Sequence, residues 1–150
     1  MSLNLDLPNP DITEDVARHF ARIISAPLVM GFSGEIGAGK TTFIRAMLRA
    51  LGVSGAIKSP TYALVESYLI ENLHIHHFDL YRIQDEAELE YIGFRDYFIS
   101  PAICCIEWSE RLQKGRDCMD IQLTLSLKGA GRALQVNATS PRGGHVLSLF

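Results

Sequence analysis

Basic residues are slightly outnumbered in this chain, which has 14 Lys and Arg against 17 Asp and Glu and therefore a net charge of −3. A protein that binds nucleic acid directly contacts the phosphate backbone with clustered Lys and Arg. The charge balance argues against such direct binding. If the protein acts on a nucleic acid, we expect a partner to supply the basic surface.

Cysteine is also scarce. The three cysteines are Cys104, Cys105 and Cys118, an odd number in which two are adjacent and none has a C-x-x-C spacing. This pattern fits neither a disulfide framework nor a zinc site. We predict free thiols, buried or half-buried, in the reducing cytoplasm.

Long apolar runs are missing as well, because the longest fall far short of the roughly 18 residues that a membrane span needs. The first segment alternates leucines with Asn4 and Asp6 and has neither the basic stretch nor the apolar run of a signal peptide. We therefore expect a cytoplasmic protein without contact to a membrane.

The chain does contain regular strand patterns within 150 residues, a length that predicts one domain over residues 1–150. With 47% hydrophobic and 21% charged residues, the composition is that of an ordinary globular protein. Period-two alternation or short apolar runs predict strands at residues 2–7, 28–32, 63–70, 73–79 and 102–106. Residues 121–127 and 134–136 alternate on either side of a glycine-rich turn, which predicts a C-terminal antiparallel hairpin.

Helical spacing alternates with these strands. The first predicted helix begins with a capping box of Asp11 and Glu14 and ends near Ser25. A second ends before Gly52, and a third surrounds Leu89. Alternating strands and helices followed by a hairpin predict a three-layer α/β fold, with a mixed, mainly parallel sheet and helices on both faces.

The most specific motif is a phosphate-binding loop between the apolar run at residues 28–32 and the second predicted helix. The pattern G-x-x-x-x-G-K-[ST] is met by Gly34, Glu35, Ile36, Gly37, Ala38, Gly39, Lys40 and Thr41. The glycines let backbone N–H groups face phosphate oxygens, and the start of the helix adds a partial positive charge. Lys40 would neutralise the outer phosphates, and the Thr41 hydroxyl can ligate Mg²⁺. The motif in this context predicts a P-loop NTPase fold.

Two carboxylates are placed to complete such a site. Asp79 ends one predicted strand, as a metal-holding aspartate should, and Glu107 ends another, where a carboxylate would orient the attacking water. Thr61, in the aperiodic loop before Asp79, is placed like a switch threonine that senses the terminal phosphate and Mg²⁺. No Asn is followed by Lys, so the usual guanine-reading motif is absent and ATP is the expected nucleotide.

Three further stretches follow the phosphate loop in order. They are Lys58-Ser59-Pro60-Thr61-Tyr62, His77-Phe78-Asp79-Leu80-Tyr81-Arg82 and Ile106-Glu107-Trp108-Ser109-Glu110-Arg111-Leu112. With these motifs the chain, from about Leu28 to Leu112, resembles the TsaE family of small bacterial ATPases required for threonylcarbamoyladenosine modification of tRNA. It departs from the usual family pattern at Glu35-Ile36, where Asp-Leu is common, and at Ser109, since a proline commonly follows the Glu-Trp pair.

The resemblance implies roles for individual residues. Lys40 and Thr41 would bind phosphate and metal, and Thr42 would lie near the nucleotide. Asp79 would complete the Mg²⁺ site, Thr61 would belong to the first switch, and Trp108 would lie against the nucleotide. Glu107 would be the hydrolytic carboxylate beside the metal. The resemblance also implies that the ATPase docks on the TsaD–TsaB complex and resets it between turnovers, with tRNA reached only through that complex. Because switch ATPases often need a partner to complete the site, we expect slow hydrolysis by the chain alone.

Other interpretations stay open on the residues alone. A small-molecule kinase would share the loop, although only Arg82 and Arg95 lie between the two carboxylates, too few for a typical arginine-bearing lid. A nucleotide-gated binding module without catalytic turnover would need the same loop residues. Trp108 could instead be a core tryptophan. His74, His76 and His77 could hold zinc, but without a cysteine or a third ligand on the same face ordinary packing is favoured.

Overall fold

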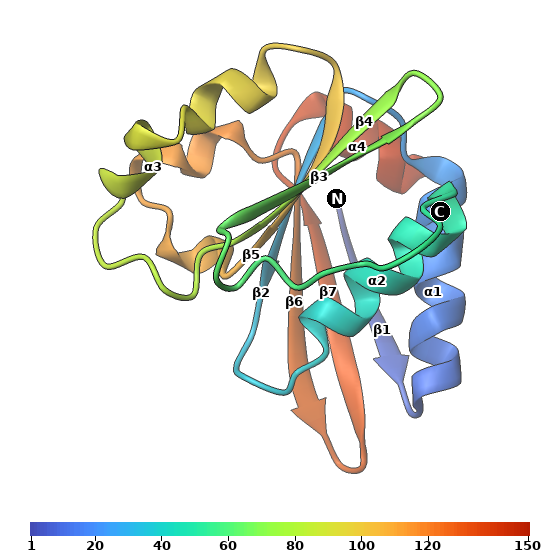
Figure 1. Cartoon of the computed structure of the whole chain (residues 1–150). Coiled ribbons are helices and arrows are strands. Elements are labelled where there is room, and N and C mark those ends of the chain that lie inside the picture. Colours follow the sequence, from blue (N-terminus) through green and yellow to red (C-terminus); the bar gives the residue numbers. More distant parts are fainter.

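Seven strands form one mixed sheet in the order β1-β7-β6-β2-β5-β4-β3 in the computed structural model, which describes all 150 residues (Figure 1). The strands are β1 (Ser2–Leu7), β2 (Leu28–Ser33), β3 (Val65–Ile70), β4 (Leu73–Asp79), β5 (Ala102–Glu107), β6 (Ile121–Lys128) and β7 (Gly131–Ala138). The helices are α1 (Pro10–Ile23), α2 (Lys40–Leu51), α3 (Glu88–Tyr91) and α4 (Pro141–Ser148). None of them is long and apolar enough to cross a membrane.

The centre of the sheet is parallel and its edges are antiparallel. β6, β2, β5 and β4 are parallel neighbours, whereas β3 pairs antiparallel with β4, and β7 pairs antiparallel with both β6 and β1. Two antiparallel steps return β1 to the direction of the central strands. The predicted α/β fold with a mainly parallel sheet and a C-terminal hairpin is therefore confirmed.

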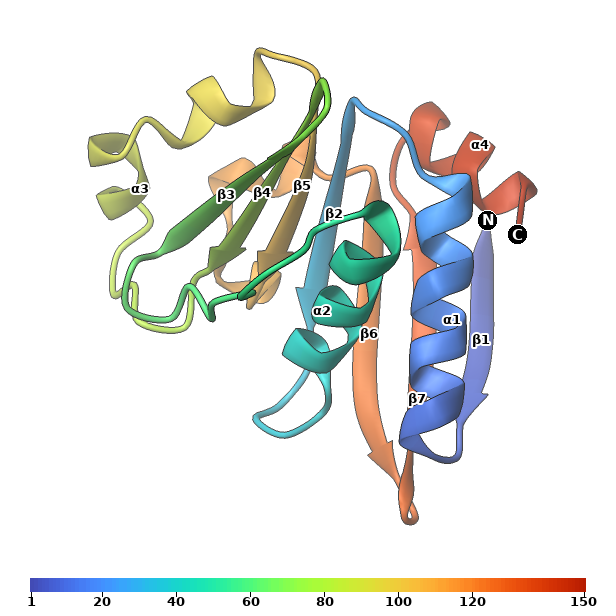
Figure 2. The same ribbon diagram turned by 45° about the vertical axis from the view of Figure 1, so that its right-hand side comes forward.

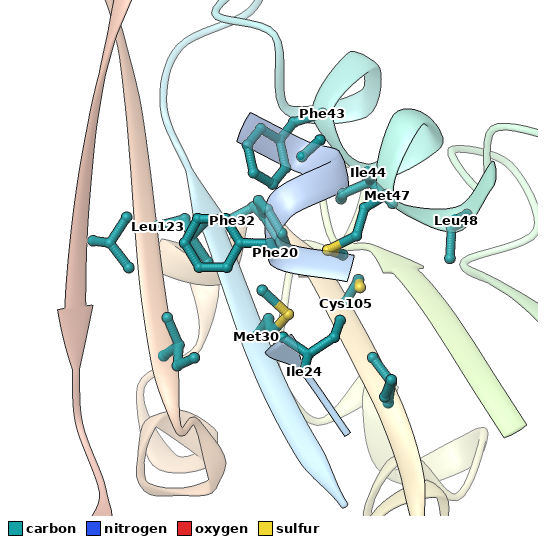
Figure 3. Close-up of a cluster of buried hydrophobic side chains, with 14 of the residues drawn as sticks. Phe20, Ile24, Met30, Phe32, Phe43, Ile44, Met47, Leu48, Cys105 and Leu123 are labelled. Carbon is teal, nitrogen blue, oxygen red and sulfur yellow. The ribbon is translucent and has the colours of Figure 1, made fainter. Parts of the chain in front are cut away.

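Helices α1 and α2 lie side by side on one face of the sheet (Figure 2). Figure 3 shows how their aromatic side chains, Phe20 of α1 and Phe43 of α2, meet Phe32 of β2 in a cluster of fully buried residues. The ring centroid of Phe43 lies 5.9 Å from that of Phe20 and 5.8 Å from that of Phe32. This packing fixes the start of α2 against the end of β2, which is where the phosphate loop lies.

The opposite face is covered by short helical segments rather than long helices. α3 and the 3₁₀ helices Phe94–Phe98, Ser109–Arg111 and Lys114–Cys118 belong to this layer. Its apolar cluster includes Phe78 of β4, packed edge-on against Phe94 with centroids 5.1 Å apart. One apolar cluster lies on each face of the sheet, so the sheet and the helical segments on its two sides form the three layers that the sequence predicts. The free thiols of Cys104 and Cys105 are buried and that of Cys118 is half-buried, as predicted.

Some local predictions are wrong. The first helix is capped by Asn9, whose side chain accepts from the Ile12 amide at 3.0 Å, and not by Asp11, which lies inside the first turn behind Pro10. Pro10 is suited to the first helical position, so Asn9-Pro10 was the stronger start signal. The strand predicted at residues 63–70 begins only at Val65, because Leu64 has a φ of +71° that interrupts the extended backbone.

The structure also contains a helix that the sequence patterns did not predict. α4 begins after Ser140, whose hydroxyl accepts from the Gly143 amide at 3.0 Å and donates to Asp120 Oδ1 at 2.7 Å. Gly143 and Gly144 weaken the helical pattern. A Cβ on Gly143 would lie 1.9 Å from the Asp120 carbonyl oxygen, so this glycine allows α4 to approach the sheet closely.

Candidate functional site

The phosphate loop (residues 34–41) connects β2 to α2 at the carboxyl end of the parallel strands, the edge where ligands of open α/β sheets bind (Figure 2). Gly34 has a φ of +138°, and a Cβ there would lie 2.3 Å from the Leu125 carbonyl oxygen of β6. Gly39 precedes α2 with a φ of +103° and open space around it. The two glycines thus serve different needs, close packing at the first and a left-handed turn into the helix at the second.

Most backbone amides of this loop have no acceptor within the protein. Gly34 N donates to Glu110 Oε2 at 3.2 Å, and Ala38 N donates to the Glu35 carbonyl at 3.1 Å. The amides without a protein acceptor are those of Glu35, Ile36, Gly37, Gly39, Lys40, Thr41 and Thr42. A run of free N–H groups at a helix N-terminus is an anion site, because the donors and the helix dipole both favour negative charge.

Lys40 is the first residue of α2 and is buried, at 5% exposure. Its Nζ donates to the carbonyls of Gly34 and Glu35, and stands 4.1 Å from the centre of the Trp108 ring. Burial lowers the pKa of the Lys40 ammonium, and the nearby carboxylates, Glu110 first among them, oppose that shift. The Lys40 ammonium is therefore a partly desolvated cation held against the backbone of the phosphate loop.

Glu107 reaches the phosphate loop from the end of β5 and is 2% exposed. Thr41 Oγ1 donates to its Oε1 at 2.7 Å. The second carboxylate oxygen, Oε2, lies 2.6 Å from Nε2 of His77 on β4. The carboxylate therefore joins α2 to β4 through its two oxygens.

Asp79 lies directly opposite Glu107 in the register of β4 with β5. Its Oδ2 accepts from Thr61 Oγ1 at 2.9 Å, and its Oδ1 accepts from the Tyr81 amide at 2.9 Å. Thr61 thereby attaches the loop before β3 to the end of β4. Because both carboxylates end parallel neighbours, they meet at the edge where the phosphate loop lies.

Trp108 follows Glu107 in a left-handed conformation, with a φ of +59°. A non-glycine residue pays a conformational cost there, which persists only when its surroundings enforce it. The half-buried ring packs against Tyr81, with centroids 5.2 Å apart, and lies under Lys40. Trp108 is thus positioned at the loop and is not enclosed within the core.

The structure brings most of the residues predicted from the sequence to one place, but not all of their side chains. Lys40, Thr41, Asp79 and Glu107 gather with Thr61 and Trp108 at the carboxyl edge of the sheet. Glu35 and Ile36 have exposed side chains and offer the site their free backbone amides. Thr42 instead turns its exposed side chain into the groove between α1 and α2, beside Arg18 and Arg45.

Two residues at the site were not among those predicted. Glu110 accepts a hydrogen bond from the Gly34 amide, and His77 contacts Glu107. His77 alternates with Ile75 and Asp79 and so lies on the same face of β4, the one turned towards α2. This period-two pattern could have placed His77 on the side of the site from the sequence alone. His74 and His76 lie on the other face, with ring centroids 6.4 Å apart.

The donor set at this edge fits Mg²⁺. The hydroxyl of Thr41 and the carboxylates of Asp79 and Glu107 are hard oxygen ligands, which Mg²⁺ prefers. No group of three or more His, Cys, Asp or Glu side chains is arranged to hold a metal ion. Magnesium in phosphate-binding proteins is usually held by one or two carboxylates together with the phosphates of the ligand.

A mainly parallel α/β sheet with this glycine-rich loop between β2 and α2 places the protein in the P-loop NTPase fold class. Within that class the chain belongs to the TsaE family, since a family model described as "Threonylcarbamoyl adenosine biosynthesis protein TsaE" matches residues 7–135.

Relatives of known name agree with this assignment. A Haemophilus influenzae protein named "tRNA threonylcarbamoyladenosine biosynthesis protein TsaE" is 43% identical over 123 residues, which cover 82% of this chain and 78% of the relative. A Bacillus subtilis protein of the same name is 30% identical over 121 residues, covering 81% of this chain and 75% of the relative. The crystal structure of Bacillus subtilis YdiB is similar in fold, with a TM-score of 0.81 at 22% identity, covering 99% of this chain and 93% of that one.

Proposed function

We propose that this protein binds and hydrolyses ATP with Mg²⁺, and that this activity serves the threonylcarbamoyladenosine modification of tRNA. The observation that carries the proposal is the set of free backbone amides in residues 35–42, all but that of Ala38, beside Lys40 and the two carboxylates. Four kinds of group that phosphoryl chemistry needs are thereby close together: amide donors, a cation, a metal-binding hydroxyl and carboxylates.

Each side chain has a defined task in this proposal. The loop amides and Lys40 bind the outer phosphates, and Lys40 gives up its carbonyl partners and its place over Trp108 to do so. Thr41 and Asp79 hold Mg²⁺, with Glu107 as a further oxygen ligand. When bound, Mg²⁺ neutralises charge on the phosphates. Thr61, bonded to Asp79, carries the state of the terminal phosphate into the loop before β3.

Glu107 is the residue that makes hydrolysis the better proposal than binding alone. Its carboxylate is buried and ends a strand next to the phosphate loop, where it can orient a water molecule for attack. Positioning of this kind requires a carboxylate that is held in place, and two hydrogen-bond partners hold this one.

The family assignment supports the biological setting. We propose that the chain acts in the cytoplasm as a nucleotide-dependent switch on a complex of TsaD and TsaB, and that tRNA is reached only through these partners. The net charge of −3 supports an indirect role, since direct binding would need a basic surface.

Reconstitution tests the proposal. The full chain is combined with purified TsaD, TsaB, the threonylcarbamoyl donor and tRNA, and both ATP hydrolysis and modified adenosine are measured over many turnovers. We expect modification to need ATP and this chain, and Glu107→Gln to keep ATP binding while it loses hydrolysis and repeated modification.

Two results would contradict the proposal. Unimpaired multiple-turnover modification by Glu107→Gln would mean that nucleotide occupancy, and not hydrolysis, is the function. Appearance of a phosphorylated small molecule in step with ATP consumption would identify a kinase instead.

A further inference from the structure

His77 is a buried polar side chain to which the proposed function gives no task. It lies on β4, two residues before Asp79 and on the same face, and is 0% exposed. Its Nε2 is 2.6 Å from Glu107 Oε2, and its Nδ1 is buried without any hydrogen-bond partner. The only polar contact of the ring is therefore the one to Glu107.

The chemistry of the two groups fixes the direction of this hydrogen bond. An ionised carboxylate only accepts, so the hydrogen is on His77 Nε2 and the imidazole donates it to Glu107. In a neutral ring the lone pair is then on Nδ1, which is the atom that lacks a partner.

Packing alone does not account for a histidine here. Burying a polar nitrogen without a partner is unfavourable, because the lost hydration is not replaced. The neighbours of His77 on this face are the fully buried Ile75 and Cys105, with Asp79 beyond it on its own strand and Glu66 opposite it on β3. Neither Asp79 nor Glu66 forms a hydrogen bond with the ring. An apolar side chain would fill this space without the cost. What the imidazole adds is one N–H donor for Glu107.

The second partner of Glu107 shows why that donor matters. Thr41 Oγ1 donates to Glu107 Oε1, yet this hydroxyl is also the one expected to serve the metal and phosphates. When Thr41 turns to them, His77 remains the donor that holds Glu107. We propose that His77 is a positioning residue that keeps the Glu107 carboxylate in its orientation for hydrolysis. This inference rests on the proposed hydrolytic role of Glu107.

Substitutions of His77 separate positioning from packing. His77→Leu keeps the bulk of the side chain and removes the donor. We expect the kcat of ATP hydrolysis by the full chain to fall by roughly tenfold to a hundredfold, the usual effect of losing a group that orients an active-site ligand. The affinity for ATP, measured by calorimetry, should stay within about twofold of the wild-type value, because the loop amides and Lys40 are untouched.

Matched variants on the same strand and at the same position sharpen the test. His77→Gln places an amide N–H where Nε2 was and should restore most of the rate, whereas His77→Asn is too short to reach Glu107 and should not. His76→Leu, on the opposite face of β4, removes a half-buried imidazole bonded to Ser67 and should leave kcat unchanged. In a Glu107→Gln background, His77→Leu should have no further effect.

The outcomes decide between the alternatives. A folded His77→Leu protein with the wild-type kcat overturns the proposal, as does an equal loss with and without Glu107. If His77→Leu does not fold, equal rates for His77→Gln and His77→Asn overturn it. Nitrogen NMR shifts of the wild-type ring should show hydrogen on Nε2, and hydrogen on Nδ1 would contradict the contact. A wild-type chain that binds ATP but never hydrolyses it, even with its partners, overturns the proposed function as well.

Discussion

Two buried carboxylates, Glu107 and Asp120, lie near opposite ends of the parallel strands and have different partners. Asp120 stands just before β6, is 6% exposed, and accepts from the Val29 amide at 2.8 Å and the Ser140 hydroxyl at 2.7 Å. These partners are a strand amide and the cap of α4, and the exposed Arg142 lies 3.6 Å from Oδ2. The carboxylate therefore joins the amino end of β2 to the start of α4, and none of its partners belongs to the phosphate loop.

Glu107, at the carboxyl edge, accepts only from side chains, Thr41 Oγ1 and His77 Nε2. One of these belongs to the phosphate loop and can turn to a ligand. The comparison teaches that burial of a carboxylate does not by itself mark a functional site. The partners do: fixed backbone and cap partners indicate architecture, and exchangeable side-chain partners beside free amides indicate chemistry.

The largest expected effect at the carboxyl edge is on binding. Lys40→Met should weaken ATP binding about 100-fold, equivalent to about 2.7 kcal/mol, because the phosphates lose their buried cation. Calorimetric titration measures the change. Lys128→Met removes an exposed lysine of the β6–β7 hairpin that pairs with Asp6 of β1, and this variant should bind ATP like the wild type. Equal affinities for wild type and Lys40→Met would place the phosphate site elsewhere.

Glu107→Gln should separate chemistry from stability. We expect kcat for ATP hydrolysis to fall about 100-fold, since a neutral amide no longer polarises the attacking water. The melting temperature should change little, because the glutamine carbonyl can still accept from His77 and its amide can donate to Thr41. Thermal unfolding and a steady-state phosphate assay measure the two quantities. A large loss of stability with normal hydrolysis would make Glu107 a structural residue like Asp120.

Asp120→Ala should show the converse. Loss of the carboxylate leaves the Val29 amide buried without a partner, and we expect a destabilisation of about 2–3 kcal/mol. For a chain of this size that lowers the melting temperature by roughly 5–10 °C. ATP affinity at a temperature where the variant is folded should not change. Asp117→Ala, an exposed neighbour without a side-chain hydrogen bond, is the matched control.

The smallest effect concerns the three cysteines, of which Cys105 lies two residues before Glu107 on the same face of β5. Burial raises the pKa of Cys104 to about 12, raises that of Cys118 to about 11, and raises that of Cys105 as well. At pH 8 only about 0.1% of Cys118 is then thiolate, so native alkylation by iodoacetamide should be slow, with Cys118 reacting first. All three should react readily in urea. Fast native labelling of Cys105 would show that solvent reaches the floor of the site.

The sequence predicted which residues meet at this edge better than it predicted the contacts that hold them there. The loop motif is local, and strand ends place Asp79 and Glu107 at one edge once the sheet is parallel, so these residues could be predicted. The His77–Glu107 contact depends on which strands become neighbours. Chain order alone does not reveal that β4 lies beside β5, so the sequence predicted only ordinary packing for His77 and its neighbouring histidines.

The same reasoning explains the errors in the fold. The Asn9 cap competed with an acidic pair that matched the capping-box pattern, and the structure used the stronger asparagine–proline signal. α4 was missed because two glycines obscure its period, although Ser140-Pro141 is a start signal of the same kind. Its glycines serve the close approach to Asp120, a tertiary requirement that local patterns do not contain.

The most direct test follows the loop amides themselves. In nitrogen–proton correlation spectra of the full chain, a non-hydrolysable ATP analogue with Mg²⁺ should shift the amides of Gly37, Gly39, Lys40 and Thr41 most. The Ala38 amide, which already donates to Glu35, should move less. If the loop amides stay in place while signals from the arginine-lined groove between α1 and α2 move, the phosphate loop does not hold the nucleotide and the account is wrong.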